Sequence, residues 1–195
     1  GVRTSGARLQ RFAHNDLEDL DQRLERLKPT TRPPLVVTES LFSMEGTSPA
    51  LTELSALCRQ HGAQLLLDEA HALGVLGDGG RGLGYRMSDV TMISGTFGKS
   101  FGSGGAFLAC DEALGDHLLQ SSGAFRYTTA LAPSLAAAAL AALQLIQDNP
   151  SWGAELLQRG EIWRARLPTA GWTRPMGPGP LLPRVGGDDP PSLDV

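Results

Sequence analysis

The sequence is poor in lysine, in cysteine and in long apolar runs, and each shortage excludes a class of protein. Only two of its 17 basic residues are lysines, and the net charge is −4 over 195 residues. The basic side chains are scattered, which argues against binding to nucleic acid or to an anionic membrane surface. The two cysteines, Cys58 and Cys110, are too few for a disulfide framework and lack a metal-ligand spacing, so we expect buried reduced thiols.

No run of residues is apolar over the length that a transmembrane helix needs. The longest candidate, residues 130–146, is interrupted by Pro133 and Gln144, so we expect an alanine-rich packed helix there. Residues 1–5 contain no apolar core of a signal peptide, and the sequence does not begin with methionine. We therefore expect a cytoplasmic protein whose sequence begins within a domain.

One of the two lysines, Lys99, stands in the glycine-rich run SGTFGKSFG at residues 94–102. A chain that uses arginine for nearly all its positive charge, yet keeps a lysine here, indicates a need for an amine. A lysine amine forms a Schiff base with an aldehyde, whereas the arginine guanidinium stays protonated. The run LLLDEAH at residues 65–71 ends an apolar strand in Asp68, with His71 three residues beyond. Amine, carboxylate and imidazole together indicate pyridoxal phosphate chemistry.

Hydrophobic periodicity predicts alternating helices and strands, which are typical of an α/β fold. A strand, a helix and a strand within about thirty residues form a βαβ unit, which implies a parallel sheet with a right-handed crossover. Beyond residue 167 the chain is rich in proline and glycine, which indicates a linker, a frayed tail or the start of a second domain. Strands are predicted at residues 35–38, 64–68, 90–94 and 105–109, and helices from residue 17 and at 50–60, 111–120, 133–147 and 151–167.

Three loops follow predicted strands, at residues 39–46, 68–71 and 96–99. Ligands of open α/β sheets bind beyond the carboxyl ends of the strands, so we expect these loops to converge on one edge. There Asp68 is suited to pair with a protonated pyridine nitrogen, which keeps the ring an electron sink. Thr96 is suited to donate to a phosphate together with nearby backbone N–H groups.

Each of these residues also has an ordinary structural explanation. Asp68 and Thr96 can each cap a turn, His71 can be a hydrogen-bonded structural histidine, and Ser43 can be a loop hydroxyl. Residues 127–129, Tyr-Thr-Thr, fit either phosphate-binding hydroxyls or a short strand. Acidic residues suggest acid/base pairs or metal ligands, but the histidines lack a matching spacing, so we expect no metal site. The acidic residues are Glu39, Glu45 and Glu69, and the histidines assigned to the surface or to helix ends are His14, His61 and His117.

Four runs, taken in order, resemble the α-oxoamine synthases: TESLFSMEG (38–46), DEAHALGVLG (68–77), GRG (80–82) and TFGK (96–99). These are fold-type-I pyridoxal phosphate enzymes that join an amino acid to an acyl thioester with loss of carbon dioxide. The resemblance implies an α/β, aminotransferase-like large domain with a mostly parallel sheet flanked by helices, incomplete at both ends. It further implies that residues 1–167 are the cofactor-binding domain, without its N-terminal part, and that 168–195 are a linker and the truncated start of a small C-terminal domain.

The same resemblance implies a role for each candidate residue. The cofactor is bound to the amine of Lys99, which, once freed by the amino acid, removes the α-proton. The active sites are shared between the subunits of a homodimer. Asp68 is placed at the pyridine nitrogen, His71 and Ser43 at the ring hydroxyl, Thr96 at the phosphate, and Thr128 or Thr129 across the subunit interface.

Within the family, the runs TFGKSFG and YTTALAP look most like the biotin-pathway member. That likeness implies L-alanine and a pimeloyl thioester, carried on coenzyme A or acyl carrier protein, as substrates. Glycine C-acetyltransferase, 5-aminolevulinate synthase and serine palmitoyltransferase remain alternatives. So does a non-catalytic fragment, because the family's ring-stacking histidine and its glycine-aromatic phosphate loop are not found in this sequence.

Overall fold

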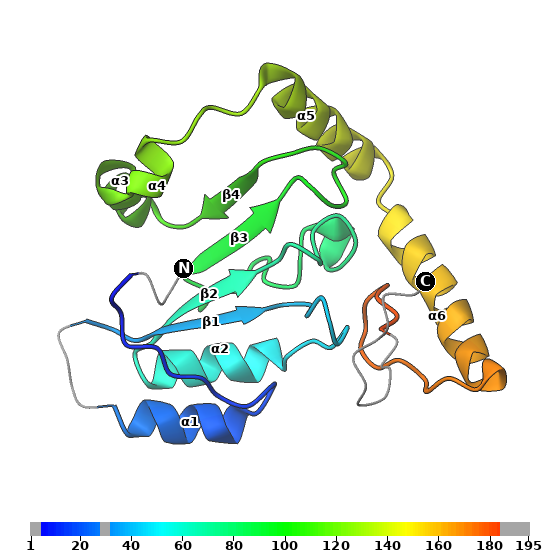
Figure 1. Ribbon diagram of the computed structural model, residues 1–195, viewed down its shortest axis with the longest axis horizontal. Helices are drawn as coiled ribbons and strands as arrows, with labels where there is room; N and C mark the ends of the chain where they lie inside the picture. The colour runs from blue at the N-terminus through cyan, green and yellow to red at the C-terminus, as the bar shows by residue number, and fades with distance from the viewer. Residues whose placement is uncertain (1–4, 28–31, 184–195) are drawn as a thin grey trace, which may run out of the picture.

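The computed structural model describes residues 5–27 and 32–183, which form an α/β arrangement around one sheet (Figure 1). The sheet has four strands in the order β1-β2-β3-β4. The first three strands are parallel to one another, and the last pairs antiparallel with the third. The predicted α/β fold with a mostly parallel sheet is thereby confirmed. The strands are β1 (Leu35–Glu39), β2 (Gln64–Asp68), β3 (Met92–Thr96) and β4 (Ala106–Ala109).

The helices and strands follow the predicted pattern with small differences. The third strand begins two residues later than predicted, and the short helix α4 was not predicted. Residues 127–129 form no strand, so that alternative was wrong. The helices are α1 (Leu17–Glu25), α2 (Leu51–Gln60), α3 (Glu112–Ser121), α4 (Gly123–Arg126), α5 (Pro133–Asp148) and α6 (Trp152–Arg166), with 3₁₀ turns η2 (Asp78–Gly80) and η3 (Leu167–Ala170).

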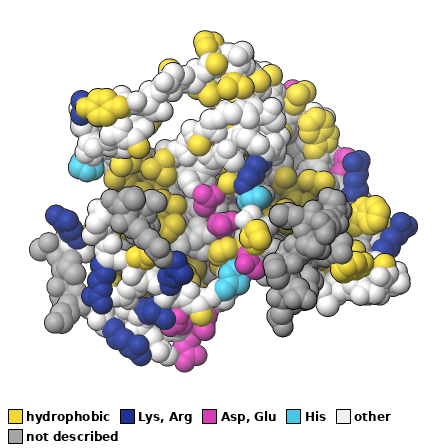
Figure 2. Space-filling view, viewed as in Figure 1, with side chains coloured by type: hydrophobic (Ala, Val, Ile, Leu, Met, Phe, Trp, Pro, Cys, Tyr) yellow, Lys and Arg dark blue, Asp and Glu magenta, His cyan; other side chains and the backbone are white. Residues whose placement is uncertain are grey.

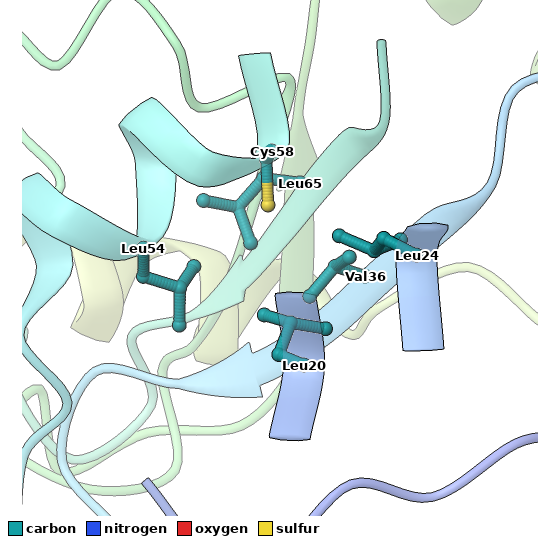
Figure 3. Packing of buried hydrophobic residues seen from close by; sticks show 6 residues of the cluster. All are labelled: Leu20, Leu24, Val36, Leu54, Cys58 and Leu65. Atoms are coloured by element: carbon teal, nitrogen blue, oxygen red, sulfur yellow. The ribbon is translucent and has the colours of Figure 1, made fainter. Parts of the chain in front are cut away.

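The main hydrophobic core lies between α1, α2 and the first two strands (Figure 3). Side chains alternate across a strand, so every second residue of β1 and β2 faces these helices. Cys58 packs in this core, where burial raises the pKa of its thiol to about 11. Cys110 is only half-buried, which corrects the expectation for that residue, because it follows the exposed strand β4. The core residues are Leu20, Leu24, Val36, Leu54, Cys58 and Leu65.

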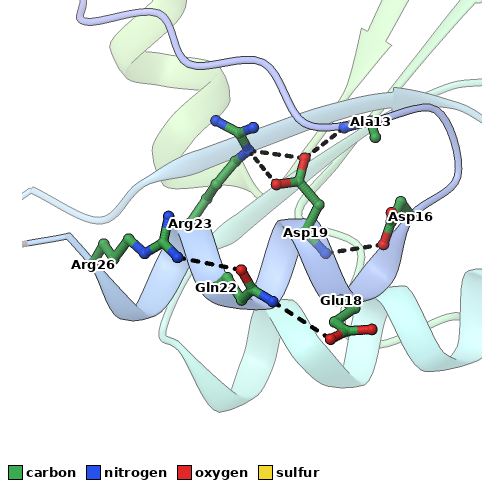
Figure 4. A network of polar contacts seen from close by, with 7 residues as sticks. All are labelled: Ala13, Asp16, Glu18, Asp19, Gln22, Arg23 and Arg26. Atoms are coloured by element: carbon green, nitrogen blue, oxygen red, sulfur yellow. Dashed lines mark hydrogen bonds and ion pairs between the residues drawn. The ribbon is translucent and has the colours of Figure 1, made fainter.

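The start of α1 is fixed by a network of polar contacts (Figure 4). The Asp16 carboxylate accepts the backbone N–H of Asp19 at 2.9 Å, which caps the helix. The Asp19 carboxylate in turn accepts the backbone N–H of Ala13 at 2.7 Å and Nε of Arg23 at 2.9 Å. These two partners lower the pKa of Asp19, the arginine contributing most. The network therefore fixes both the helix and the segment before it.

Helix α5 differs from the packed helix that the sequence predicts. Ala139 is its only buried residue, and Leu140 is 56% exposed. The helix lies beyond the edge strand β4 in Figure 1, so little of the described chain covers it. No helix among the described residues is both long and apolar enough to cross a membrane.

The proline- and glycine-rich segment after α6 folds back onto the body of the protein. Arg164 donates to the carbonyl of Gly179 at 2.8 Å. Gly179 packs on Leu41, and a Cβ on Gly177 would collide with the carbonyl of Gly46. As far as residue 183 the segment is therefore docked rather than frayed. Residues 184–195 lie outside the described part of the chain, and the proposed division at residue 167 stays a prediction.

Two leucines of the sheet test where the core lies. Leu65 of β2 is fully buried, whereas Leu35 of β1 is 49% exposed. We expect Leu65→Ala to lower the free energy of unfolding by about 2–5 kcal/mol, because it opens a cavity. We expect Leu35→Ala to change it by about 0.5 kcal/mol. Urea denaturation of the two variants measures this, and equal losses would contradict the assigned core.

Candidate active site

The parallel strands end together, and this brings the predicted loops to one edge of the sheet. Glu39 pairs with Asp68, and Asp68 pairs with Ser94, so the last residues of the first two strands are aligned with the third. The three strands point the same way in Figure 1, toward the side where their loops emerge. Near the centre of the face in Figure 2, acidic side chains gather beside a histidine and a basic side chain. The predicted convergence of the three loops is confirmed.

Asp68 is held by two hydrogen bonds at the end of β2. Its Oδ1 accepts the backbone N–H of Ala70 at 2.8 Å, and its Oδ2 accepts the hydroxyl of Ser94 at 2.8 Å. The side chain is half-buried, so its orientation is fixed while part of it stays accessible. Sequence reasoning missed Ser94; its place at the end of a predicted strand was the only signal for it.

Lys99 and His71 meet, although 28 residues separate them in the sequence. The Lys99 amine contacts Nε2 of the His71 imidazole. Burial and then the Lys99 charge lower the pKa of His71, while the Glu39 and Asp68 carboxylates act in the opposite direction. The net effect favours a neutral imidazole, whose Nε2 can accept a hydrogen bond from the lysine amine.

Ser43 lies exposed in the loop after β1, close to Glu39. Its backbone N–H donates to Oε2 of the Glu39 carboxylate at 3.2 Å. Glu39 is also near enough to His71 for its charge to act on the pKa of the imidazole. Ser43 therefore belongs to the same edge of the sheet, while its placement against a cofactor ring stays a prediction.

Thr96 organises the lysine loop. Its hydroxyl donates to the carbonyl of Gly105 at 3.1 Å and accepts the backbone N–H of Gly98 at 3.1 Å. This is the turn-capping role that the sequence analysis kept as the alternative. A phosphate contact would require the hydroxyl to leave Gly105, so its role at the phosphate stays a prediction.

Thr128 is exposed in the stretch between α4 and α5. The same stretch contains Leu131, which packs against Gly105 beside the lysine loop. No contact joins Thr128 to Lys99 among the contacts of the described residues. Its predicted contribution across a subunit interface is left as a prediction.

The structure gives Glu69, His14 and His61 structural positions. Glu69 is fully buried, with a carboxylate that accepts the Ser40 hydroxyl at 2.6 Å, a role that the sequence analysis missed. His14 is exposed and contacts Thr47 Oγ1 at 2.7 Å, and His61 ends α2. No cluster of potential metal ligands occurs within residues 5–27 and 32–183.

The side chains at this edge of the sheet fit pyridoxal phosphate. Lys99 offers an amine for the aldehyde, and the fixed Asp68 carboxylate offers an acceptor for a protonated ring nitrogen. An added Cβ at Gly98 would make only ordinary contacts, with the Thr96 hydroxyl at 3.4 Å and the Ser103 carbonyl oxygen at 3.8 Å, so the backbone of this turn is not covered by other side chains there. The residues therefore suit an aldehyde that carries a cationic ring.

A family model for aminotransferases of class I and II matches residues 1–190. The chain belongs to the aminotransferase class I and II family. The curated 8-amino-7-oxononanoate synthase of Chromohalobacter salexigens is 44% identical over 192 residues, which are 97% of this chain and 50% of that protein. The chain thus spans about half the length of the curated relatives it matches.

Solved structures show the same relationship. A serine palmitoyltransferase from S. paucimobilis with a bound PLP–myriocin aldimine has a TM-score of 0.77 and 31% identity, covering 83% of this chain and 42% of that one. The 8-amino-7-oxononanoate synthase of Francisella tularensis has a TM-score of 0.74 and 27% identity, covering 89% and 50%. The resemblance to the α-oxoamine synthases, and with it the fold class, is confirmed.

The contact between Lys99 and His71 predicts a measurable pKa. We expect nuclear magnetic resonance titration to place the pKa of His71 below its ordinary value of 6.5, and Lys99→Met to raise it only part of the way, because burial remains. Because the pKa of His71 is lower in the folded chain, the unfolded chain takes up the imidazole proton at a higher pH. The free energy of unfolding therefore falls as the pH drops below 6.5. Arg59→Met, which removes an exposed charge paired with Asp89, serves as the control. A pKa unchanged by Lys99→Met would contradict the contact.

Proposed function

We propose that this chain carries the catalytic centre of a pyridoxal phosphate-dependent synthase that condenses L-alanine with a pimeloyl thioester to give 8-amino-7-oxononanoate, a step of biotin biosynthesis. The observation that carries the proposal is the meeting of Lys99, His71 and Asp68 at one edge of the sheet. The identity of 44% to a curated synthase of that name supports this choice of substrates. The thioester carrier, coenzyme A or acyl carrier protein, belongs to the same proposal.

The residues of this edge would divide the work by their chemistry. Bound there, pyridoxal phosphate supplies an aldehyde and an electron-accepting ring. The Lys99 amine would bind that aldehyde and, when free and neutral, would take the α-proton of the amino acid. Asp68, whose carboxylate is fixed by Ser94 and Ala70, would hold the proton on the ring nitrogen. His71 accepts a hydrogen bond from Lys99 through Nε2, which orients the amine.

A serine palmitoyltransferase is the second candidate, because a solved enzyme of that name matches with a TM-score of 0.77. That activity would use the same sheet edge with a different amino acid and acyl group. A homodimer with shared active sites is part of either proposal, with Thr128 as a contributor from the second subunit. The chain spans about half the length of its curated relatives, so the activity of the whole enzyme is proposed rather than that of this segment alone.

Lys99 is expected to be the amine that binds pyridoxal phosphate. Borohydride converts the Schiff base to a stable secondary amine, which mass spectrometry then locates in the digested chain. The chain contains two lysines, so the assay has few competing amines. We expect the label on Lys99 in the parent chain and in Lys28→Arg, and its loss in Lys99→Arg.

The same experiment separates binding from non-specific reaction. Substoichiometric pyridoxal phosphate favours the specific site over exposed amines. Equal labelling of Lys28, Lys99 and the α-amino group would contradict a formed site at this edge of the sheet.

Substrate choice is expected to show in proton exchange. In deuterated water that contains this chain and pyridoxal phosphate, we expect the α-proton of L-alanine to exchange about tenfold faster, or more, than that of glycine or L-serine. Magnetic resonance of the amino acid measures the exchange, and Lys99→Arg is the control because it removes the base. Faster exchange of serine would favour the palmitoyltransferase alternative.

A further inference from the structure

Glu69, the residue after Asp68, faces the opposite side of the sheet and is fully buried. Leu65 and Leu67 of β2 are also fully buried, and Glu69 continues their alternation. Asp68, between Leu67 and Glu69 in the sequence, points to the opposite side, is half-buried and accepts a hydrogen bond from Ser94. Two neighbouring carboxylates therefore serve two different environments, because successive side chains of an extended strand point to opposite faces.

The buried Glu69 carboxylate joins two segments that are far apart in the sequence. Its Oε2 accepts the hydroxyl of Ser40, itself fully buried just beyond β1, and its Oε1 accepts the backbone N–H of Gly84. A Cβ on Gly82 would come within 2.8 Å of the Glu69 carboxyl carbon. The glycines at 82 and 84 thus make room for the carboxylate.

The backbone of Glu69 is equally engaged. Its N–H donates to the carbonyl of Ser94 on β3 at 2.8 Å. Its carbonyl accepts the N–H groups of Ala72 and Leu73, both at 2.9 Å, which closes the turn that carries His71. One residue therefore connects the ends of β1 and β3, the His71 turn and the loop at residues 82–84.

We propose that Glu69 is the positioning residue of this site: its buried carboxylate fixes the turn between Asp68 and His71, and so sets where the imidazole meets Lys99. Glu69 touches neither Lys99 nor His71 through its side chain in the contacts that the described residues make. It acts through Ser40 and Gly84. Of the two measurements that test this inference, only that of cofactor affinity rests on the proposed function.

Substitutions of Glu69 separate hydrogen bonding from charge. Glu69→Gln keeps both contacts, because the carbonyl oxygen of the new amide accepts from Gly84 and its NH₂ group donates to the Ser40 hydroxyl. Glu69→Leu leaves the Ser40 hydroxyl and the Gly84 N–H without partners in the interior. Ser40→Ala removes one of the two bonds at little change in volume.

The first measurement is the pKa of His71 by magnetic resonance titration, which needs no cofactor. Glu39, Asp68 and Lys99 are the charged groups that act on this imidazole. We expect Glu69→Leu and Ser40→Ala to move the pKa of His71 toward 6.5, and Glu69→Gln to leave it near the parent value. The second measurement is pyridoxal phosphate affinity, expected to fall about 10- to 100-fold in Glu69→Leu and to be kept in Glu69→Gln.

A destabilised but unrelated variant controls for a general loss of structure. Leu54→Ala removes a side chain that is 1% exposed in the core under α2, and we expect it to leave the pKa of His71 unchanged. Should Glu69→Leu fail to fold, Ser40→Ala decides the question. Folded Glu69→Leu or Ser40→Ala with the parent pKa of His71 would overturn the inference. A parent chain that binds no cofactor, while its His71 still responds to these variants, would overturn the proposed function and leave the inference standing.

Discussion

The parallel pairing of β1, β2 and β3 is the constraint on which the candidate site depends. Residues far apart in the sequence become neighbours because Glu39, Asp68 and Ser94 occupy aligned positions in the three parallel strands. A shift of one residue would turn Asp68 toward the helix-covered face and place Glu69 at the open edge. The buried contacts of Glu69 oppose such a shift, since its carboxylate finds Ser40 and Gly84 only in the observed register.

Much of this architecture could be predicted from the sequence, because local patterns determine it. The helix that begins at residue 17, the βαβ unit and the convergence of the strand ends all follow from periodicity and topology. Asp68 and Lys99 stood out because a carboxylate ends an apolar strand and a rare amine follows another. These signals need no knowledge of contacts between distant residues.

The rest depends on such contacts and could not be predicted. The partnership of Glu69 with Ser40 spans 29 residues, and the docking of Gly177 on Gly46 spans far more. The expected packing of α5 was wrong because alanine content indicates a helix but not what lies against it. The turn role of Thr96 depends on the carbonyl of Gly105, which no pattern in the sequence marks.

The most direct test of the account is mapping pyridoxal phosphate on the chain by backbone amide chemical shifts. The convergence of the strand ends predicts that the perturbed amides gather in three separate stretches, at residues 39–43, 68–73 and 94–99, and that they saturate together. Shifts confined to the sequence around Lys28, or scattered over exposed amines without saturation, would contradict a single cofactor site at the carboxyl edge of the sheet.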